Sequence, residues 1–349
     1  MQTTHEVHVG DARDLSLPDD SIELVVTSPP YPMIEMWDAS FAAQDSRIRD
    51  ALSAEEGDRA FDLMHDLLDD AWAEVARVLV PGGIAVVNVG DATRTVGDTF
   101  SQYPNHVEIT RRLRGHGLSA LPDIVWRKPT NSAAKFMGSG MLPPNAYPTL
   151  EHEHLLVFRN GDTRSFPPGD DARYGSAYFW EERNEWFSDL WEITGTRQSL
   201  PGEVRARSGA FPLDLPLRLV LMFSVYGDTV LDPFWGTGTT SMAALVAGRN
   251  SAGVEREPDL VGAFAERVGE APRISEALAT ERLDRHREFV TERRSDGEEP
   301  GYEAEHYDFP VVTKQERSIQ LRVVESVGRE NTDGEEDATN RWVAQHVTM

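Results

Sequence analysis

The chain has 349 residues, 40% of them hydrophobic, which is enough for one large α/β domain with insertions or for two domains. It contains no cysteine, so disulfides, thiolate metal sites and cysteine nucleophiles are excluded. Acidic residues outnumber basic residues by 59 to 34, and only three of the basic residues are lysines. A carboxylate-rich surface nearly free of lysine is typical of proteins kept soluble in concentrated salt, so we expect a halophilic source; an ordinary acidic enzyme is the alternative.

The charge and the amino-terminal segment also bear on location and partners. The first residues, MQTTHEVHVGD, lack the basic and apolar regions of a signal peptide, and no apolar run approaches the ~18 residues that span a bilayer. We therefore expect a soluble cytoplasmic protein without a membrane partner. Acidity argues against a nucleic-acid partner in dilute solution, but this argument weakens in molar salt, where the Debye length falls to ~3 Å.

The first half of the chain predicts strands alternating with helices. Residues 20–27, DSIELVVT, form a nearly continuous apolar run, as in a buried strand of a parallel sheet, and this strand ends at Ser28. Residues 54–79 have helical spacing and are stopped by Pro81-Gly82-Gly83. A strand at 84–89, a helix at 103–115 and strands at 124–126 and 153–158 follow.

The second half resumes this alternation after an interruption. Residues 161–201 are rich in Gly, Pro, Arg and aromatic residues and predict an inserted segment of different character. We then expect a helix at 213–225, a strand at 229–231, a helix at 239–247 and a strand at 251–254. After Gly269 we expect a helix to about Arg293 and a solvated or partly disordered polar tail. The pattern predicts a doubly wound α/β fold with a mostly parallel sheet.

The turn in VLDPFWGTGTTSMAALVAGRNSAGVERE, residues 230–257, predicts a nucleoside site. Gly236 and Gly238 permit a tight turn with positive φ, and Thr239 or Thr240 can cap the following helix. Roughly 20 residues later, Glu255 ends the next strand, where an acidic side chain binds ribose hydroxyls. Ser241 replaces the third glycine of the dinucleotide fingerprint, which suits an adenosine ligand without a pyrophosphate. A purely structural strand-to-helix turn is the alternative.

The order TSPPY, then DPFWGTGTT some 200 residues later, resembles the β-class of amino-group DNA methyltransferases, in which the catalytic motif precedes the cofactor motif. The resemblance spans roughly Val7 to Glu257, because further blocks of the sequence also agree with that family. These blocks are HVGDARDLSLPDDSIELVVTSPPY, WAEVARVLVPGGIAVVNVGD, DIVWRKP, EHEHLLVF and RSGAFPLDLPLRLVLMFSVYGDTVLDPF. It is closest to modification methylases of halophilic archaea that are associated with CTAG sites. It implies a Rossmann-like fold and S-adenosylmethionine as the cofactor.

The resemblance also implies a set of cofactor contacts. Asp11 matches the position that reaches the adenine edge, although a turn aspartate is the alternative. Phe211 and Pro212 match positions beside the methionine moiety, or pack at a helix entry, and Asp232 either contacts the amino-acid part or organises the turn. The full expected set is Asp11, Thr27, Phe211, Pro212, Asp232, Pro233, Phe234, Gly236, Thr237, Gly238, Thr239, Thr240 and Glu255.

The expected catalytic residues are Ser28, Pro29, Pro30 and Tyr31. An exocyclic amine on a nucleobase is a poor nucleophile because its lone pair is delocalised, so the enzyme must accept its hydrogen bonds. The Ser28 hydroxyl and the carbonyls of the rigid proline loop are suitable acceptors. Tyr31 offers a flat surface for a base extruded from the duplex. No covalent intermediate is needed, in agreement with the absence of cysteine.

Target recognition is expected in residues 131–207, where arginines can contact bases or phosphates. Salt bridging within an acidic protein is the alternative for each of them. The candidates are Arg164, Arg173, Arg183, Arg197, Arg205 and Arg207. The ten histidines show no HxxxH spacing, so no metal is predicted.

These expectations define four segments and one function. Residues 1–130 and 208–268 form the methyltransferase domain, 131–207 a strand and recognition insert, and 269–349 an acidic extension. We expect methyl transfer to the N4 amine of cytosine in duplex DNA, because Ser in place of Asp at position 28 is associated with cytosine targets in the resembled family. Adenine N6, an RNA or protein substrate, and a non-catalytic DNA-binding role stay open, as do monomer and homodimer.

Overall fold

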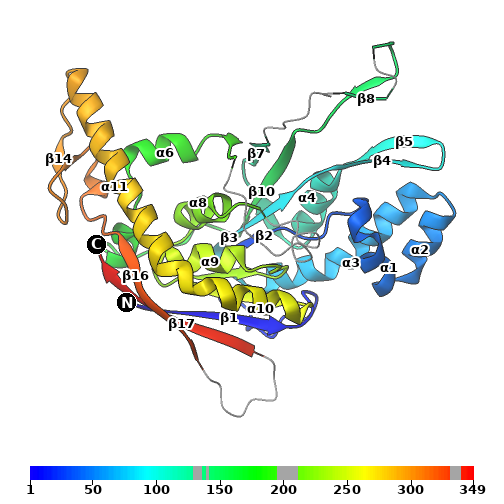
Figure 1. The fold of residues 1–349 in the computed structure, drawn as a ribbon, viewed down its shortest axis with the longest axis horizontal. Coiled ribbons are helices and arrows are strands. Elements are labelled where there is room, and N and C mark those ends of the chain that lie inside the picture. Colours follow the sequence, from blue (N-terminus) through cyan, green and yellow to red (C-terminus); the bar gives the residue numbers. More distant parts are fainter. Residues whose placement is uncertain (129–135, 139–140, 195–210, 331–338) are drawn as a thin grey trace.

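The computed structural model describes residues 1–128, 136–138, 141–194, 211–330 and 339–349. Its centre is an 11-stranded sheet with the order β11-β7-β10-β3-β2-β12-β13-β1-β17-β16, and β6 pairs with β10 outside this path (Figure 1). The strands are β1 (Gln2–Val9), β2 (Ile22–Thr27), β3 (Leu79–Val89), β6 (Leu118–Ala120), β7 (Ile124–Arg127), β10 (His152–Asn160), β11 (Leu190–Glu192), β12 (Thr229–Asp232), β13 (Asn250–Glu255), β16 (Arg322–Glu330) and β17 (Thr339–Thr348).

The five central strands, β3-β2-β12-β13-β1, are parallel, and antiparallel pairs flank them on both sides. The apolar runs of β2 and β12 are buried on both faces, as expected for parallel strands covered by helices. The predicted α/β class is therefore confirmed, and its parallel part is the middle of the sheet.

Helices cover both faces of this sheet. On one face lie α3 (Gly57–Val78) and α4 (Asn105–Gly115), and on the other lie α8 (Asp214–Phe223) and α9 (Thr239–Val246). Side chains four residues apart on α3, such as Met64, Leu68 and Trp72, enter the core together. None of the helices in the described ranges is long and apolar enough to cross a membrane.

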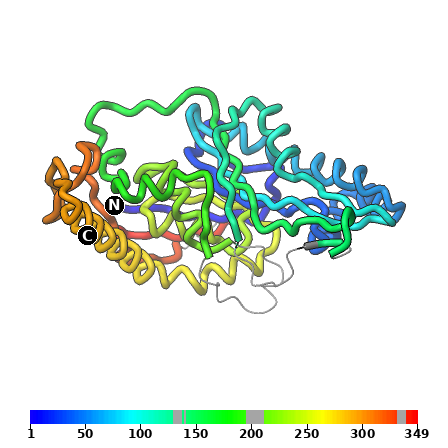
Figure 2. Tube along the Cα trace, turned by 90° about the horizontal axis from the view of Figure 1, so that it is seen from above, coloured from blue at the N-terminus to red at the C-terminus, as the bar shows by residue number. Residues whose placement is uncertain are grey.

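Smaller elements project from this core. The helices α1 (Asp38–Gln44) and α2 (Ser46–Ser53) lie at the opposite end of the molecule from the carboxy-terminal elements (Figures 1 and 2). Two hairpins, β4 (Ala92–Val96) with β5 (Thr99–Tyr103) and β8 (Phe136–Gly138) with β9 (Ala146–Pro148), extend beyond the sheet. The remaining elements are η1 (Glu35–Trp37), α5 (Asp171–Gly175), α6 (Trp180–Trp186), α10 (Pro258–Arg267), η2 (Val268–Glu270), β14 (Tyr302–Glu303), β15 (Pro310–Val311) and η3 (Lys314–Glu316).

The main helices and strands predicted from the sequence lie within a few residues of their observed bounds, with one shift at 81–83. These residues do not separate the helix from the strand, because β3 already begins at Leu79 and contains them. The pairing register with β2 shifts between Ile22 and Leu24 at this point, which accommodates the irregular backbone.

The prediction of a polar tail after about Arg293 is wrong for most of that segment. The helix α11 (Ala271–Ser295) was expected, but β16 and β17 then extend the central sheet past β1. Trp342 and Ala344 of β17 pack with Phe264 of α10 in a buried cluster. The few apolar side chains of β17 are separated by polar residues, so the composition of this segment did not indicate a half-buried strand. Residues 334–337, the most polar part of the expected tail, lie outside the described ranges.

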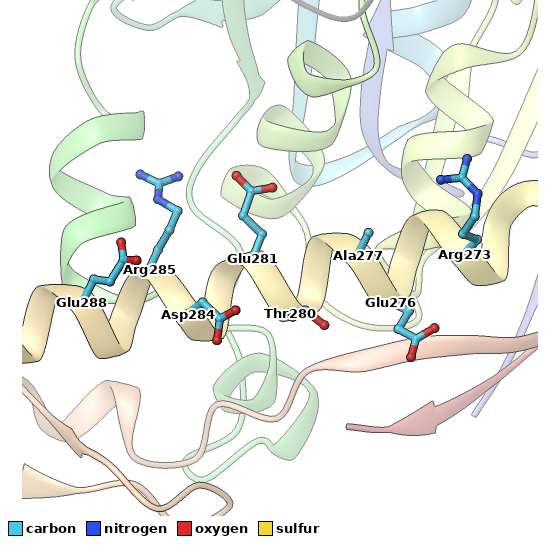
Figure 3. A pocket seen from close by; sticks show the side chains of 8 residues that line it. All are labelled: Arg273, Glu276, Ala277, Thr280, Glu281, Asp284, Arg285 and Glu288. Carbon is cyan, nitrogen blue, oxygen red and sulfur yellow. The ribbon is translucent and has the colours of Figure 1, made fainter.

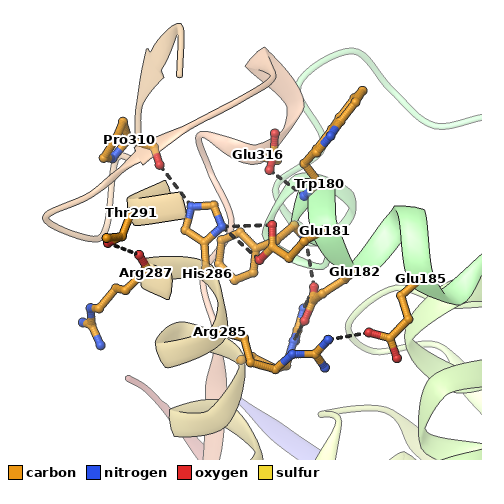
Figure 4. Close-up of polar contacts among 12 residues, drawn as sticks. Trp180, Glu181, Glu182, Glu185, Arg285, His286, Arg287, Thr291, Pro310 and Glu316 are labelled. Carbon is orange, nitrogen blue, oxygen red and sulfur yellow. Dashed lines mark hydrogen bonds and ion pairs between the residues drawn. The ribbon is translucent and has the colours of Figure 1, made fainter. Parts of the chain in front are cut away.

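Charged pairs join α6, in the expected recognition segment, to α11 (Figure 4). Glu182, which is 2% exposed, accepts hydrogen bonds of 2.6 and 2.8 Å from Arg282. The two nitrogens of His286 lie 3.0 Å from a Glu181 carboxylate oxygen and 3.0 Å from the Pro310 carbonyl oxygen. Both partners only accept, so His286 donates from both nitrogens and is an imidazolium. We refer to these contacts as the α6–α11 pairs.

An open depression of about 660 Å³ runs along α11 (Figure 3). Its lining side chains all belong to that one helix, and the charged ones have both signs. None comes from the two sequence motifs, so this depression is not the site that the motifs predict. The lining residues are Arg273, Glu276, Ala277, Thr280, Glu281, Asp284, Arg285 and Glu288.

The charge of His286 makes the stability of this region depend on pH. Burial alone lowers the pKa of His286, but the Glu181 carboxylate and the Pro310 carbonyl outweigh it, and the net pKa is raised. A raised folded-state pKa stabilises the protein fully below about pH 6.5, and this contribution is lost as the pH rises through the folded value. We expect His286→Gln to lower the stability by about 1.5–3 kcal/mol at pH 6 and by less at pH 9.

Thermal unfolding at several pH values measures this difference. His306→Gln is the matched control, because His306 is exposed on the same extension. An equal loss of stability for His286→Gln at pH 6 and pH 9 would contradict the charged contact.

Candidate active site

The two sequence motifs follow strands that end at the same edge of the sheet. Parallel pairing of β2 with β12, with Leu24 opposite Val230 and Val25 opposite Leu231, places their carboxyl ends side by side. Residues 28–31 follow β2, and residues 233–238 follow β12. This edge is where open α/β sheets bind their ligands.

Buried hydrogen bonds tie the two motifs together. The Thr27 hydroxyl donates to Asp232 Oδ1 over 2.6 Å, and the Phe234 amide donates to the same oxygen over 3.1 Å. The Thr240 hydroxyl donates to the Val26 carbonyl over 3.1 Å. Asp232 is 3% exposed, and burial raises its pKa to about 6 although its donors oppose this shift. Asp232 therefore organises the turn in this structure.

The glycine turn has the predicted backbone but a different cap. Gly236 has φ +56° and Gly238 has φ +73°, as expected for positive-φ glycines. The prediction that Thr239 or Thr240 caps α9 is wrong, because the N-cap residue is Gly238 and no side chain bonds there. Both threonines lie too far along the chain, in the first turn of the helix.

Trp235 packs under this turn, and the space that its ring needs accounts for the small residues beside it. Its indole nitrogen donates to Ser241 Oγ over 2.7 Å, so Ser241, in place of a glycine, anchors the turn. A Cβ on Gly253 would lie 2.0 Å from Trp235 Cδ1, and one on Gly238 would lie 2.6 Å from Trp235 Cζ2. Glycine at both positions is therefore required for this tryptophan to fit.

Two carboxylates stand beside the turn. Glu255 accepts hydrogen bonds from the amides of Gly236, over 2.7 Å, and Glu257, over 2.9 Å. Burial raises the pKa of Glu255. The Gly10 amide donates to the Glu255 carbonyl, which brings Asp11 to the same edge. Arg13 pairs with Asp11 over 2.7 Å and lowers the pKa of Asp11.

The other expected cofactor residues differ in location, since some lie in the turn and others pack in the apolar core. Phe234 is partly buried against Trp72, with ring centroids 5.8 Å apart. Phe211 is buried in the core cluster around α8, and Pro212 lies beside it at the entry to that helix. Thr237 is buried within the turn. The packing of Phe211 is that of a helix-entry residue, and a role beside the methionine moiety stays a prediction.

The proline loop carries a hydrogen-bonded cluster around its tyrosine. Ser28 Oγ lies 2.9 Å from Tyr31 Oη, and Tyr31 Oη lies 3.1 Å from Glu153 Oε2. Asn88 Nδ2 donates to Tyr31 Oη over 2.8 Å and to Glu153 over 2.7 Å. Burial, and then the charge of Glu153, raise the pKa of Tyr31 well above its usual range, so Tyr31 is neutral. Lys128 forms an ion pair with Glu153.

Comparison with known proteins connects this edge to a family. A family model described as DNA methylase matches residues 22–266, which include both motifs. The chain belongs to this DNA methylase family. It is 46% identical over 327 residues to the type II methyltransferase M.MthZI of Methanothermobacter thermautotrophicus, covering 92% of this chain and 91% of that protein. It is 47% identical over 281 residues to M.MjaI of Methanocaldococcus jannaschii, covering 77% of this chain and 92% of that protein.

Solved structures share the fold of this DNA methylase. TTHA0409 of Thermus thermophilus, solved in complex with S-adenosyl-L-methionine, is 33% identical with a TM-score of 0.59, covering 76% of this chain and 93% of that one. The cytosine-N4-specific PvuII DNA methyltransferase has a TM-score of 0.53, covering 75% of this chain and 86% of that one. Its 19% identity shows a common methyltransferase fold alone.

Sequence reasoning missed Asn88, Glu153 and Lys128 of the methylase site. Asn88 and Glu153 lie on β3 and β10, whose antiparallel register pairs Leu155 with Asn88. A polar residue at the end of an apolar strand is the signal that could have singled out Asn88 and Glu153. The register that brings them to Tyr31 is a property of the folded sheet.

Two of the arginines expected to contact DNA have partners away from the proline loop in this structure, and their role in DNA binding stays a prediction. Arg164 is paired with Asp228, over 2.7 and 2.9 Å, at the start of β12 and thus at the opposite sheet edge from Ser28. Arg173 contacts the Phe166 ring, as Arg164 does, with centroid distances of 4.7 and 4.8 Å. Arg183 stacks on Trp180 and stays a candidate. Arg197, Arg205 and Arg207 lie outside the described residues.

The link between the two motifs predicts a pH dependence for the methylase. All the donors around Asp232 favour its carboxylate form, so protonation weakens the turn. A folded-state pKa of about 6 means that binding of S-adenosyl-L-methionine, the expected cofactor, decreases as the pH falls through 6. Thr27→Val removes a donor to the carboxylate, so it raises the pKa of Asp232 and moves this midpoint towards neutral pH.

Titration calorimetry between pH 5 and pH 8 measures the midpoint. Thr95→Val, at an exposed position on β4, is the control and should leave it unchanged. An identical midpoint for Thr27→Val and the wild type would show that this hydrogen bond does not govern the turn.

Proposed function

We propose that this DNA methylase transfers a methyl group from S-adenosyl-L-methionine to the N4 amine of cytosine in duplex DNA. One observation carries the proposal: the Ser28 hydroxyl and the glycine turn lie at the same sheet edge, joined by Thr27 and Asp232. A hydrogen-bond acceptor for an amine is thus fixed beside a nucleoside-binding turn. S-adenosyl-L-methionine is the cofactor that this arrangement and the family support.

The residues at this edge fit that cofactor. Glu255 engages two amide donors, and a carboxylate has about four acceptor sites, so it can still accept from ribose hydroxyls. Asp11 at the same edge offers acceptor oxygens for an adenine amine. Gly236 has no side chain to fill the space above the turn, where a Cβ would meet only one atom within 4 Å. When bound, the cofactor supplies an electrophilic methyl group.

The proline loop supplies what the amine requires. Ser28 accepts an N–H hydrogen bond, which shifts the amine towards a pyramidal, nucleophilic nitrogen. Pro29 and Pro30 lack amide hydrogens and hold the loop rigid, so the carbonyls of the loop stay available as further acceptors. The Tyr31 hydroxyl is held by Asn88 and Glu153, which fixes the plane of its ring for stacking on an extruded base.

Serine at position 28 favours cytosine N4 over adenine N6 as the target amine. The family model covers DNA methylases in general, and the names of the two type II relatives do not specify the base. Adenine N6 is therefore the alternative, and an RNA or protein substrate is a more distant one. The CTAG recognition sequence, the halophilic cytoplasmic setting and the four segments 1–130, 131–207, 208–268 and 269–349 are part of the same proposal.

We also propose that the β8–β9 hairpin contacts the DNA. Its tip presents Met141 and Leu142, which are 96% and 72% exposed. Its stem is braced on the β4–β5 hairpin, where Tyr147 stacks on Phe100 with centroids 5.3 Å apart. Apolar side chains on a projecting element can enter a groove and support an opened base step. This surface is added to the arginines in the recognition proposal.

Replacing the catalytic serine tests the function. We expect Ser28→Ala to reduce methyl transfer by at least about 100-fold, because the amine loses its acceptor, while S-adenosyl-L-methionine binds as in the wild type. Radiolabelled methyl transfer to duplex DNA in concentrated KCl measures the rate, and calorimetry measures cofactor binding. Full activity of the variant would remove Ser28 from the chemistry.

Nucleoside analysis of the product identifies the amine. N4-methylcytosine as the modified nucleoside is the expected result, and mapping it in a methylation-free host gives the recognition sequence. N6-methyladenine alone would replace the cytosine proposal by its alternative. Label in RNA or protein but not in DNA would reject a DNA substrate.

The hairpin has its own test. We expect Met141→Ser with Leu142→Ser to weaken DNA binding by about tenfold or more, since burying one such side chain contributes about 1.5–3 kcal/mol. Cofactor binding should not change. Tyr302→Ser is the control, because Tyr302 is an exposed apolar residue on β14 at the other end of the molecule (Figure 1). Equal DNA affinity of the double variant and the wild type would exclude the hairpin from the interface.

A further inference from the structure

The hydrogen bonds around Tyr31 have a defined direction. An amide nitrogen only donates, so Asn88 Nδ2 gives hydrogens to Tyr31 Oη and to Glu153. The opposite amide orientation would place a carbonyl oxygen against the Glu153 carboxylate. A carboxylate only accepts, so the single hydroxyl hydrogen of Tyr31 goes to Glu153. The remaining contact, between Ser28 and Tyr31, therefore has Ser28 as the donor.

The result is a chain of hydrogen bonds that runs from Ser28 through Tyr31 to Glu153. Because Ser28 donates its hydroxyl hydrogen to Tyr31, its lone pairs are left to accept from an incoming amine. The far end of the chain is an ionisable carboxylate, and the Glu153 side chain is 14% exposed. Lys128 forms an ion pair with this carboxylate. The chain thus connects the proposed amine position to a group that can exchange protons with water.

We propose that Glu153 is the terminal acceptor for the proton that the substrate amine loses, reached through Ser28 and Tyr31. This inference rests on the proposed methyl transfer to an amine. After the carbon–nitrogen bond forms, the nitrogen carries one proton too many. An N–H bond breaks as a Ser28 O–H bond forms. The original Ser28 proton passes to Tyr31 Oη, and the Tyr31 proton passes to Glu153. Ser28 and Tyr31 end unchanged, and Glu153 gains one proton, which it releases to solvent.

The sheet holds the acceptor in position. Asn88 and Glu153 are diagonal neighbours on one face of the β3–β10 pair, which is close enough for direct contact between such side chains. Gly90 leaves room for the carboxylate, since a Cβ there would lie 3.2 Å from Glu153 Cγ and 3.3 Å from Tyr31 Cε2. Glu153 acts through Tyr31 and is a positioning and proton-accepting residue that does not touch the base.

The variant Glu153→Gln separates proton acceptance from shape. Its amide oxygen still accepts from Tyr31, but it cannot take a proton. We expect the single-turnover rate of methyl transfer to DNA to fall about 100-fold or more, with unchanged affinity for cofactor and DNA. In the variant the rate should increase with buffer base, which replaces the carboxylate, whereas the wild-type rate should not respond to buffer base.

Tyr31→Phe breaks the same chain at its middle. If the chain acts as one unit, the double variant Tyr31→Phe with Glu153→Gln should be no slower than the slower single variant. Glu192→Gln is the matched control, since Glu192 is an exposed glutamate paired with Arg127 on the neighbouring strand. A wild-type rate for Glu153→Gln, without a response to buffer base, would overturn the proposal. So would additive losses in the double variant.

The two proposals fail in different ways. If the wild type binds S-adenosyl-L-methionine but methylates no DNA base, the proposed function fails. If the wild type methylates cytosine and Glu153→Gln keeps the wild-type rate without a response to buffer base, the function stands and the proton route is rejected.

Discussion

The hydrogen bond from Thr27 to Asp232 is the constraint on which the site depends. It joins the ends of two adjacent parallel strands that are separated by some 200 residues in the chain. On one side it fixes the start of the proline loop, and on the other it fixes the amide of Phe234 at the start of the glycine turn. Burying this carboxylate is unfavourable, as its raised pKa shows, and its two donors, the Thr27 hydroxyl and the Phe234 amide, offset part of the cost. The relative position of the proline loop and the glycine turn is thus set by a buried polar contact.

Much of the structure at this edge of the sheet could be predicted, because it is determined by residues that are close together in the sequence. An apolar run stopped by two prolines marks β2 and its loop, and glycines two apart mark the positive-φ turn after β12. The same reasoning placed an acidic residue at the end of β13, where Glu255 indeed contacts the turn. Each of these conclusions needs only the backbone preferences of neighbouring residues.

The features that were missed depend on pairing between distant segments. Glu153 reaches Tyr31 because of the register of β10 on β3, and nothing near residue 153 in the chain specifies that register. The fit of Trp235 depends on Gly253 on the next strand, and the position of Arg164 is set by its pair with Asp228. The strands β16 and β17 were mistaken for a tail, because strands with one buried face carry few apolar residues. Local composition cannot distinguish these cases from solvated segments.

The burial of the α6–α11 pairs has a consequence for how the stability of the protein depends on salt. Exposed ion pairs are weakened in molar salt, where screening acts within ~3 Å, but buried or partly buried pairs are screened much less. Glu182 and His286 are almost fully buried, so the attachment of α6 to α11 should persist at ionic strengths that abolish surface attractions. A protein with this design would keep its two segments joined whether the surrounding salt is dilute or concentrated, and its acidic exterior could adapt independently of its internal joints.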